Sequence, residues 1–184
     1  MSQYYLMAQL PSLDALPDPT SPPITEERFL ELCRALMPRK AQTDVSGLTL
    51  TPKKEGECAH SPLLRAFYDG ERKLRTALGA LRAKKMNKPF DMEANDVSAP
   101  LLQTAKAAIE CTDPLEAEML LSKYRLEFLE SLRPADAFSD DAVFYYALRL
   151  KLLWRIARFD TGKGEQAYRN IYSSIIGEEQ EVLR

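Results

Sequence analysis

A long helical pattern between Phe67 and Lys85, whose apolar stripe contains a charge, constrains this chain more than any other stretch. At about 100° per residue, the side chains of Phe67, Leu74 and Leu78 fall on one face of that helix. Glu71 falls within the same stripe. A carboxylate placed against an apolar core is costly unless a cation meets it. The sequence therefore predicts a charged partner for Glu71, on a neighbouring helix or on another protein.

Start signals for helices recur along the chain. Ser61-Pro62 and Asp113-Pro114 each join an N-cap residue to a proline at the first helical position, where no backbone N–H is required. Thr25 and Ser139 are also predicted N-cap residues, and each is followed by two acidic residues that suit the positive end of a helix dipole. The expected helices fall approximately at residues 25–37, 61–85, 98–112, 113–132, 139–159 and 165–177.

These helices predict a mostly α fold, a single-domain bundle of about six helices over residues 1–177, followed by a frayed tail at 178–184. Two apolar stripes on the helix at 139–159 place it centrally in that bundle. Gly162-Lys163-Gly164 is expected to break the chain before the last helix, and Gly177 to end that helix.

The N-terminal region carries the weakest helical signals. Residues 1–23 contain five prolines and are expected to lie extended over the surface. Val45–Thr51, within the segment 39–60, alternates enough for a short strand that would pair with Tyr4–Leu10. A loop over residues 39–60 is an equal alternative, so at most a short β-pair is expected.

The predicted helices differ in charge. Residues 65–85 contain seven basic and two acidic side chains, whereas the helix that starts at Asp113 is acidic and the one at 139–159 is basic. We expect the acidic helix to pack between the two basic ones, because a guanidinium can pair bidentately with a carboxylate while its stem packs against apolar neighbours. The hypothesis is a partly buried network of Glu71, Arg75, Glu118, Arg125, Arg149 and Arg155. Such a network would orient the helices; binding a substrate is the alternative.

Motifs that would indicate a catalytic or metal site are not found in the sequence. His60 is the only histidine, so a histidine-based metal cluster and a Ser-His-Asp triad are excluded. The three cysteines have no ligand spacing and suit a reducing compartment. Gly162-Lys163-Gly164 lacks the spacing of a phosphate-binding loop. No cofactor is therefore expected, and an enzyme that uses buried carboxylates is kept only as an alternative class.

A basic surface on the predicted helix at 65–85 offers a place for a partner. The outward-facing docking candidates are Arg72, Lys73, Arg82, Lys84 and Lys85. An alternative function is the binding of nucleic acid or another polyanion through residues 65–88. The net charge of −2 and the lack of aromatic side chains among these cations argue against nucleic acid.

The sequence indicates a cytoplasmic protein. The start of the chain has no basic leader, and no apolar run approaches the roughly 20 residues of a membrane span. Any association with a membrane would therefore be peripheral, through a complex.

Scattered blocks over most of the chain resemble a known family. They are Tyr4–Leu13, Phe67-Tyr68 with Glu71-Arg72 and Leu74-Arg75, Leu81–Lys85, Asp113–Glu118, and Ala147–Arg155 with Arg158–Asp160. This set resembles a family of uncharacterised bacterial proteins encoded within V-type ATPase operons. That family is in turn similar to the C (d-type) subunit, the all-helical adaptor between the rotor stalk and the membrane ring.

The resemblance implies a non-catalytic accessory or adaptor component of a bacterial V-type ATPase. Its partners would be protein subunits on the stalk or ring side, and it would dock through charged helices rather than perform chemistry. We expect the chain to be too short to reproduce the full set of helical bundles of the adaptor. It could therefore replace that subunit, complete it or assist its assembly.

Overall fold

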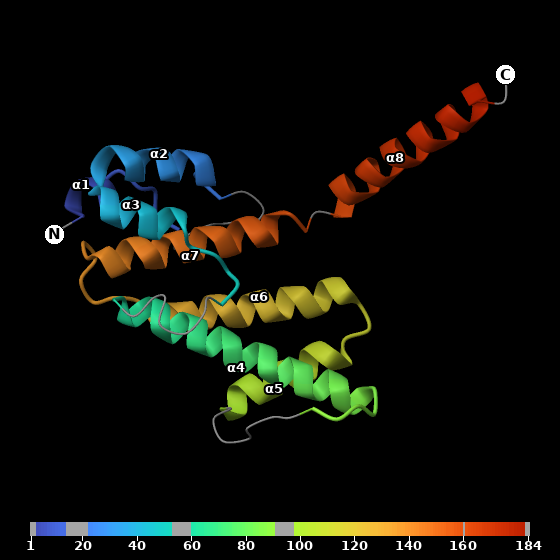
Figure 1. Ribbon diagram of the computed structural model, residues 1–184, viewed down its shortest axis with the longest axis horizontal. Coiled ribbons are helices and arrows are strands. Elements are labelled where there is room, and N and C mark those ends of the chain that lie inside the picture. Colours follow the sequence, from blue (N-terminus) through green and yellow to red (C-terminus); the bar gives the residue numbers. More distant parts are fainter. Residues whose placement is uncertain (1–2, 14–21, 53–59, 91–97, 160, 183–184) are drawn as a thin grey trace.

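The computed structural model describes residues 3–13, 22–52, 60–90, 98–159 and 161–182, which form eight helices and no strand (Figure 1). The mostly α fold predicted from the sequence is therefore confirmed. In chain order the helices are α1 (Tyr4–Met7), α2 (Glu26–Leu36), α3 (Arg39–Ser46), α4 (Pro62–Lys85), α5 (Ala99–Glu110), α6 (Pro114–Ser131), α7 (Asp140–Ala157) and α8 (Thr161–Val182).

Two short helices raise the number above the six expected. Helix α1 lies within the expected strand Tyr4–Leu10, whereas α3 overlaps the expected strand Val45–Thr51 only at Val45 and Ser46. Tyr4–Met7 forms a single helical turn that buries Leu6 against the core. Arg39–Ser46 forms α3, which begins directly after Pro38 and buries Val45. The β-pair does not form among the described residues. In their helical conformation α1 and α3 each bury one apolar side chain in the core, whereas a strand would point successive side chains to opposite faces. Much of the predicted extended start (14–21) and of the 39–60 segment (53–59) lies outside the described residues.

The last helix differs from its prediction at both ends. It begins at Thr161, so Gly162 and Gly164 lie inside the helix rather than in a break before it. It then continues through Gly177 to Val182, where the sequence indicated a frayed tail. A glycine inside a helix costs only about 1 kcal/mol relative to alanine, which a long helix tolerates.

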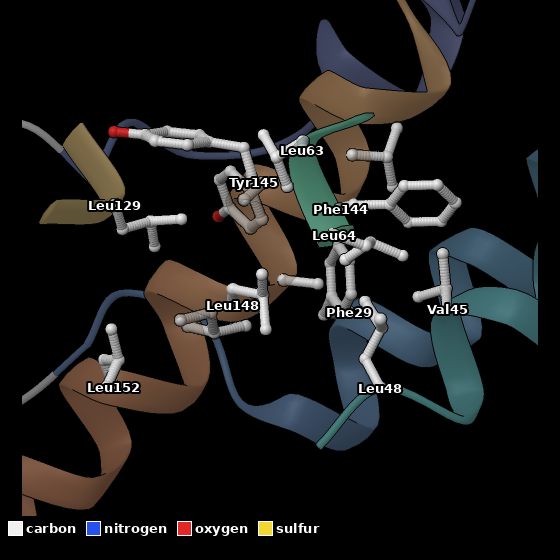
Figure 2. Close-up of a cluster of buried hydrophobic side chains, with 14 of the residues drawn as sticks. Phe29, Val45, Leu48, Leu63, Leu64, Leu129, Phe144, Tyr145, Leu148 and Leu152 are labelled. Atoms are coloured by element: carbon white, nitrogen blue, oxygen red, sulfur yellow. The ribbon is translucent and has the colours of Figure 1, made fainter. Parts of the chain in front are cut away.

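Helix α7 is the centre of the fold. It packs against α3, α4 and α6, with α1–α3 on one side and α4–α6 on the other (Figure 1). Its buried side chains include Leu148 and Leu152, and these belong to one main apolar cluster with Leu64 of α4, Leu129 of α6 and Val45 of α3 (Figure 2). The two apolar stripes of the sequence thus correspond to two packed faces of one helix.

A second apolar cluster lies at the other end of α4. It joins Leu74 and Leu78 of α4 to Leu101 and Ala105 of α5 and to Leu121 of α6. Helix α4 therefore serves two cores, the main cluster through its first half and this cluster through its second half.

Helices α4 and α6 approach each other closely at a glycine. A Cβ atom added to Gly70 would lie 2.3 Å from Cε1 of Phe128, inside the ring's van der Waals surface. A side chain at this position would push the helices or the ring apart. Gly70 thus permits the separation that the next residue, Glu71, needs in order to reach α6.

Candidate functional site

Glu71 is the buried centre of a charge network. Its side chain is only 3% exposed. Its Oε1 accepts hydrogen bonds from Nε of Arg75 and Nη2 of Arg125, each at 3.0 Å, and its Oε2 accepts one from Nε of Arg125 at 2.9 Å. Arg125 therefore binds the carboxylate in a bidentate pair, the geometry that gives guanidinium–carboxylate pairs their strength and direction.

The network continues from α6 to α7. Nη1 of Arg125 lies 3.5 Å from Oε1 of Glu118, and Nε of Arg155 donates to the same oxygen at 2.8 Å. Charges alternate from Arg75 through to Arg155, so each carboxylate lies between two cations. The structure thus brings five of the six proposed residues into one chain of contacts across α4, α6 and α7.

Arg149, the sixth proposed member, lies in a different cluster. Its Nη1 pairs with Oε2 of Glu130 at 2.5 Å and with the hydroxyl of Tyr145 at 2.8 Å. The reason is helical geometry: six residues at 100° place Arg149 and Arg155 roughly 120° apart around α7. The two side chains therefore face different neighbours.

Glu130 and Tyr145 were not predicted as site residues. The Tyr145 hydroxyl donates to Oε2 of Glu130 at 2.5 Å, and this hydrogen bond, aided by Arg133 and Arg149, lowers the pKa of the Glu130 carboxyl. Burial, followed by the bond to Glu130, raises the pKa of Tyr145. Neither residue interrupts an apolar stripe in the way that Glu71 does, so the sequence carried no comparable signal for this cluster.

The five docking candidates fall into two groups. Arg72 and Lys73 are half-buried and both lie near Asp69, at 3.7 and 3.2 Å. Arg82, Lys84 and Lys85 are exposed at the C-terminal end of α4. No carboxylate of the described residues forms an ion pair with these last three. We call Arg82, Lys84 and Lys85 the basic tip.

Polar side chains elsewhere are engaged in local structure. The Ser61 hydroxyl caps α4 by accepting from the Leu64 amide at 3.1 Å, and it donates to Asp141 at 2.6 Å. His60 lies 3.5 Å from Asp44 rather than against a nucleophile. Burial raises the pKa of the Cys33 thiol to about 12, so this thiol stays protonated near neutral pH.

Metal-binding clusters and membrane-spanning helices are both lacking in the described ranges. These ranges contain no group of three or more His, Cys, Asp or Glu side chains placed to hold a metal ion. None of the helices in the same part of the chain is long and apolar enough to cross a membrane.

Comparison with known proteins gives one match. A family model with the description "Protein of unknown function (DUF2764)" matches residues 99–179, from the start of α5 to the last turns of α8. No curated protein and no solved structure matches the chain. The matched segment contains Glu118, Arg125 and Arg155, whereas Glu71 and the basic tip precede it.

Proposed function

We propose that the protein is a non-catalytic accessory or adaptor component of a bacterial V-type ATPase, which docks through the basic tip of α4. The observation that carries the docking surface is the exposure of Arg82, Lys84 and Lys85, unpaired with any described carboxylate. The identity of the partner rests on the resemblance of the sequence blocks to proteins of V-type ATPase operons.

The position of the basic tip suits docking. The bidentate pair between Glu71 and Arg125 and the second apolar cluster fix α4 against its neighbours, so the tip is presented by a rigid rod. Cations at a helix C-terminus are also favoured by the helix dipole. An acidic surface on a stalk or ring-side subunit would be attracted to this tip and oriented by it.

The buried network supports a positioning role rather than a catalytic one. Both oxygens of Glu71 already accept hydrogen bonds from guanidinium groups of Arg75 and Arg125. A general acid or base needs an oxygen that can reach a substrate proton. In the proposed function the network holds α4, α6 and α7 in register, so that the tip keeps its geometry.

The test is co-purification with the subunits of a V-type ATPase, coexpressed with the full-length protein. We expect the wild type to associate and the triple variant Arg82→Glu, Lys84→Glu, Lys85→Glu to lose association. Failure of the wild type to bind when all subunits are present would refute the proposed function.

A matched control reverses the same number of charges elsewhere. Arg39→Glu and Lys40→Glu lie in the first turn of α3, where acidic residues are favoured, and Lys106→Glu lies on the exposed face of α5. This control is expected to associate like the wild type. Its loss of association would show that net charge, rather than the basic tip, governs docking.

The same basic tip also favours a second candidate function, the binding of nucleic acid or another polyanion. Contacts with three phosphates predict that the logarithm of affinity falls with the logarithm of salt concentration at a slope of about −3. Titration of labelled duplex DNA and RNA between low and physiological salt measures this slope. Micromolar affinity for DNA or RNA with that salt dependence would favour this candidate, provided that the protein does not bind ATPase subunits.

A further inference from the structure

Two large apolar side chains are exposed beside the basic tip. Met86 is the C-cap residue of α4 and is 62% exposed, and Phe90, four residues later, is 45% exposed. Lys88 lies between them in the sequence and is also exposed. Attraction between charges explains a surface of cations, but it does not explain an apolar pair placed among them.

The end of α4 turns the chain back on the helix. Asn87 has a φ of +54°. Its amide donates to the Lys84 carbonyl at 3.2 Å, and the Lys88 amide donates to the Ala83 carbonyl at 2.9 Å. These are the two hydrogen bonds of a Schellman motif, in which a left-handed residue ends a helix. Asparagine adopts this conformation more readily than most residues. The turn therefore directs the following residues back along α4.

A glycine of α4 receives the returning aromatic ring. A Cβ atom added to Gly79 would lie 3.1 Å from both Cε2 and Cζ of Phe90, so the ring lies directly against this backbone position. One part of the Phe90 side chain is thus held by α4, while the rest stays exposed. Aromatic side chains that are fixed before binding make good anchors, because little conformational entropy is lost when a partner covers them.

Helical geometry places Met86 on the same side of α4 as this ring. At about 100° per residue, Arg82 and Met86 both lie within roughly 60° of Gly79 around the helix axis. Met86 therefore lies beside the position that the Phe90 ring covers, and the Arg82 guanidinium borders the pair. An apolar centre with a charged border is the usual anatomy of a protein–protein interface.

We propose that Met86 and Phe90 anchor the docking contact of the basic tip, and that the partner presents an apolar pocket rimmed by carboxylates. This inference rests on the proposed function, in which the partner is a subunit of a V-type ATPase. The cations attract and orient the acidic rim, which acts mainly on the association rate. The apolar pair fills the pocket and slows dissociation, as buried anchors usually do.

A protein pocket suits this pair better than a membrane surface does. Peripheral binding to a bilayer usually uses an amphipathic helix that buries a long apolar face. Here the two side chains expose together only on the order of 200 Å², which is enough to fill one pocket. The chain also has a net charge of −2, so an anionic membrane would repel most of the protein.

The test measures the binding kinetics of the full-length protein on purified V-type ATPase subunits by biolayer interferometry. The double variant Met86→Ser, Phe90→Ser keeps every cation of the tip. We expect it to bind about 30-fold more weakly than the wild type, mainly through faster dissociation. Added salt should instead slow the association of the wild type, because it screens the cations.

The matched control removes an exposed aromatic ring and an exposed methionine elsewhere. Tyr5 on α1 is 76% exposed and Met119 on α6 is 39% exposed, so Tyr5→Ser, Met119→Ser is expected to bind like the wild type. Circular dichroism checks that each variant keeps its helices. If the loss of the Phe90 ring disturbs the end of α4, Met86→Ser alone leaves that contact intact and should still weaken binding by about 5-fold.

The outcomes separate this inference from the proposed function. Wild-type binding that persists unchanged in the Met86→Ser, Phe90→Ser variant would overturn the inference and leave the proposed function standing. Wild-type protein that binds none of the subunits would overturn both. Sedimentation with phosphatidylglycerol vesicles that requires Met86 and Phe90 would assign the apolar pair to a membrane surface, and would also overturn the inference.

Discussion

Removing Arg125 should expose how much the fold depends on the Glu71 network. Arg125→Met keeps a long side chain at this position and deletes two of the three hydrogen bonds to the Glu71 carboxylate. Hydrogen bonds to charged groups contribute about 1.5–3 kcal/mol each, and breaking a buried ion pair costs about 3–5 kcal/mol. Because Arg75 still holds one carboxylate oxygen, we expect a loss near the lower end, about 3 kcal/mol in the free energy of unfolding.

The double variant Glu71→Leu, Arg125→Met tests the cause. Replacing both members of a buried pair by apolar side chains is often nearly neutral, because no charge is left uncompensated. The double variant should therefore lose less stability than the sum of its two single variants, with a coupling free energy of about 1–3 kcal/mol. Urea unfolding, with the midpoint and slope fitted for each of the four proteins, measures this coupling.

Two results would refute this account. A loss below about 0.5 kcal/mol for Arg125→Met would place the pair in the class of exposed ion pairs. Full additivity of the two substitutions would show that Glu71 and Arg125 act independently. The control is Arg169→Met on α8, whose partner Glu165 lies 3.6 Å away with both side chains largely exposed, and which should change stability very little.

Three further predictions concern other parts of the chain. The pKa of Glu130 is lower in the folded protein than in the unfolded chain, so its carboxylate should stabilise the fold above its unfolded pKa of about 4.3. This stabilisation should be lost as pH falls further, through the folded pKa. The difference in unfolding free energy between wild type and Glu130→Gln should therefore vanish in acid, and it should be smaller in a Tyr145→Phe background. Gly70→Ala should lower the free energy of unfolding by about 1 kcal/mol, because an overpacking cost of about 1–3 kcal/mol exceeds the gain in helix propensity. Urea unfolding measures this change. A variant more stable than the wild type would show that α4 and α6 can move apart at no cost. Iodoacetamide at pH 8 should modify Cys33 at least about 100-fold more slowly than half-exposed Cys111 in the folded protein, and mass spectrometry of digested samples would reveal equal labelling if burial did not protect the Cys33 thiol.

Local signals predicted the long helices because their capping chemistry lies within a few residues. The N-cap hydroxyls of Ser61 and Ser139 accept hydrogen bonds from amides three residues later, as the sequence indicated. The α1 and α3 turns were missed because each depends on burying an apolar side chain, Leu6 or Val45, against distant helices. Short helices have little stability of their own, so tertiary packing decides whether they form.

The charge network was partly accessible to prediction for a different reason. Glu71 interrupts an apolar stripe, and the cost of burying a carboxylate requires a cation wherever the fold supplies one. The choice of Arg125, 54 residues away, depends on how α4 crosses α6, and Gly70 sets that crossing. The assignment of Arg149 needed the rotation of α7 about its axis, which the charge pattern alone did not determine.

The position of Glu71 along α4 has a consequence for how the protein opens. Phe67 and Tyr68 before it belong to the main apolar cluster, whereas Leu74 after it belongs to the second one. The carboxylate and its arginines therefore form a polar layer between the two apolar clusters, and α5 packs into only the second cluster. We expect the second cluster to open by local unfolding while α7 stays folded. The amide hydrogens of α5 should therefore exchange with solvent faster than those of α7.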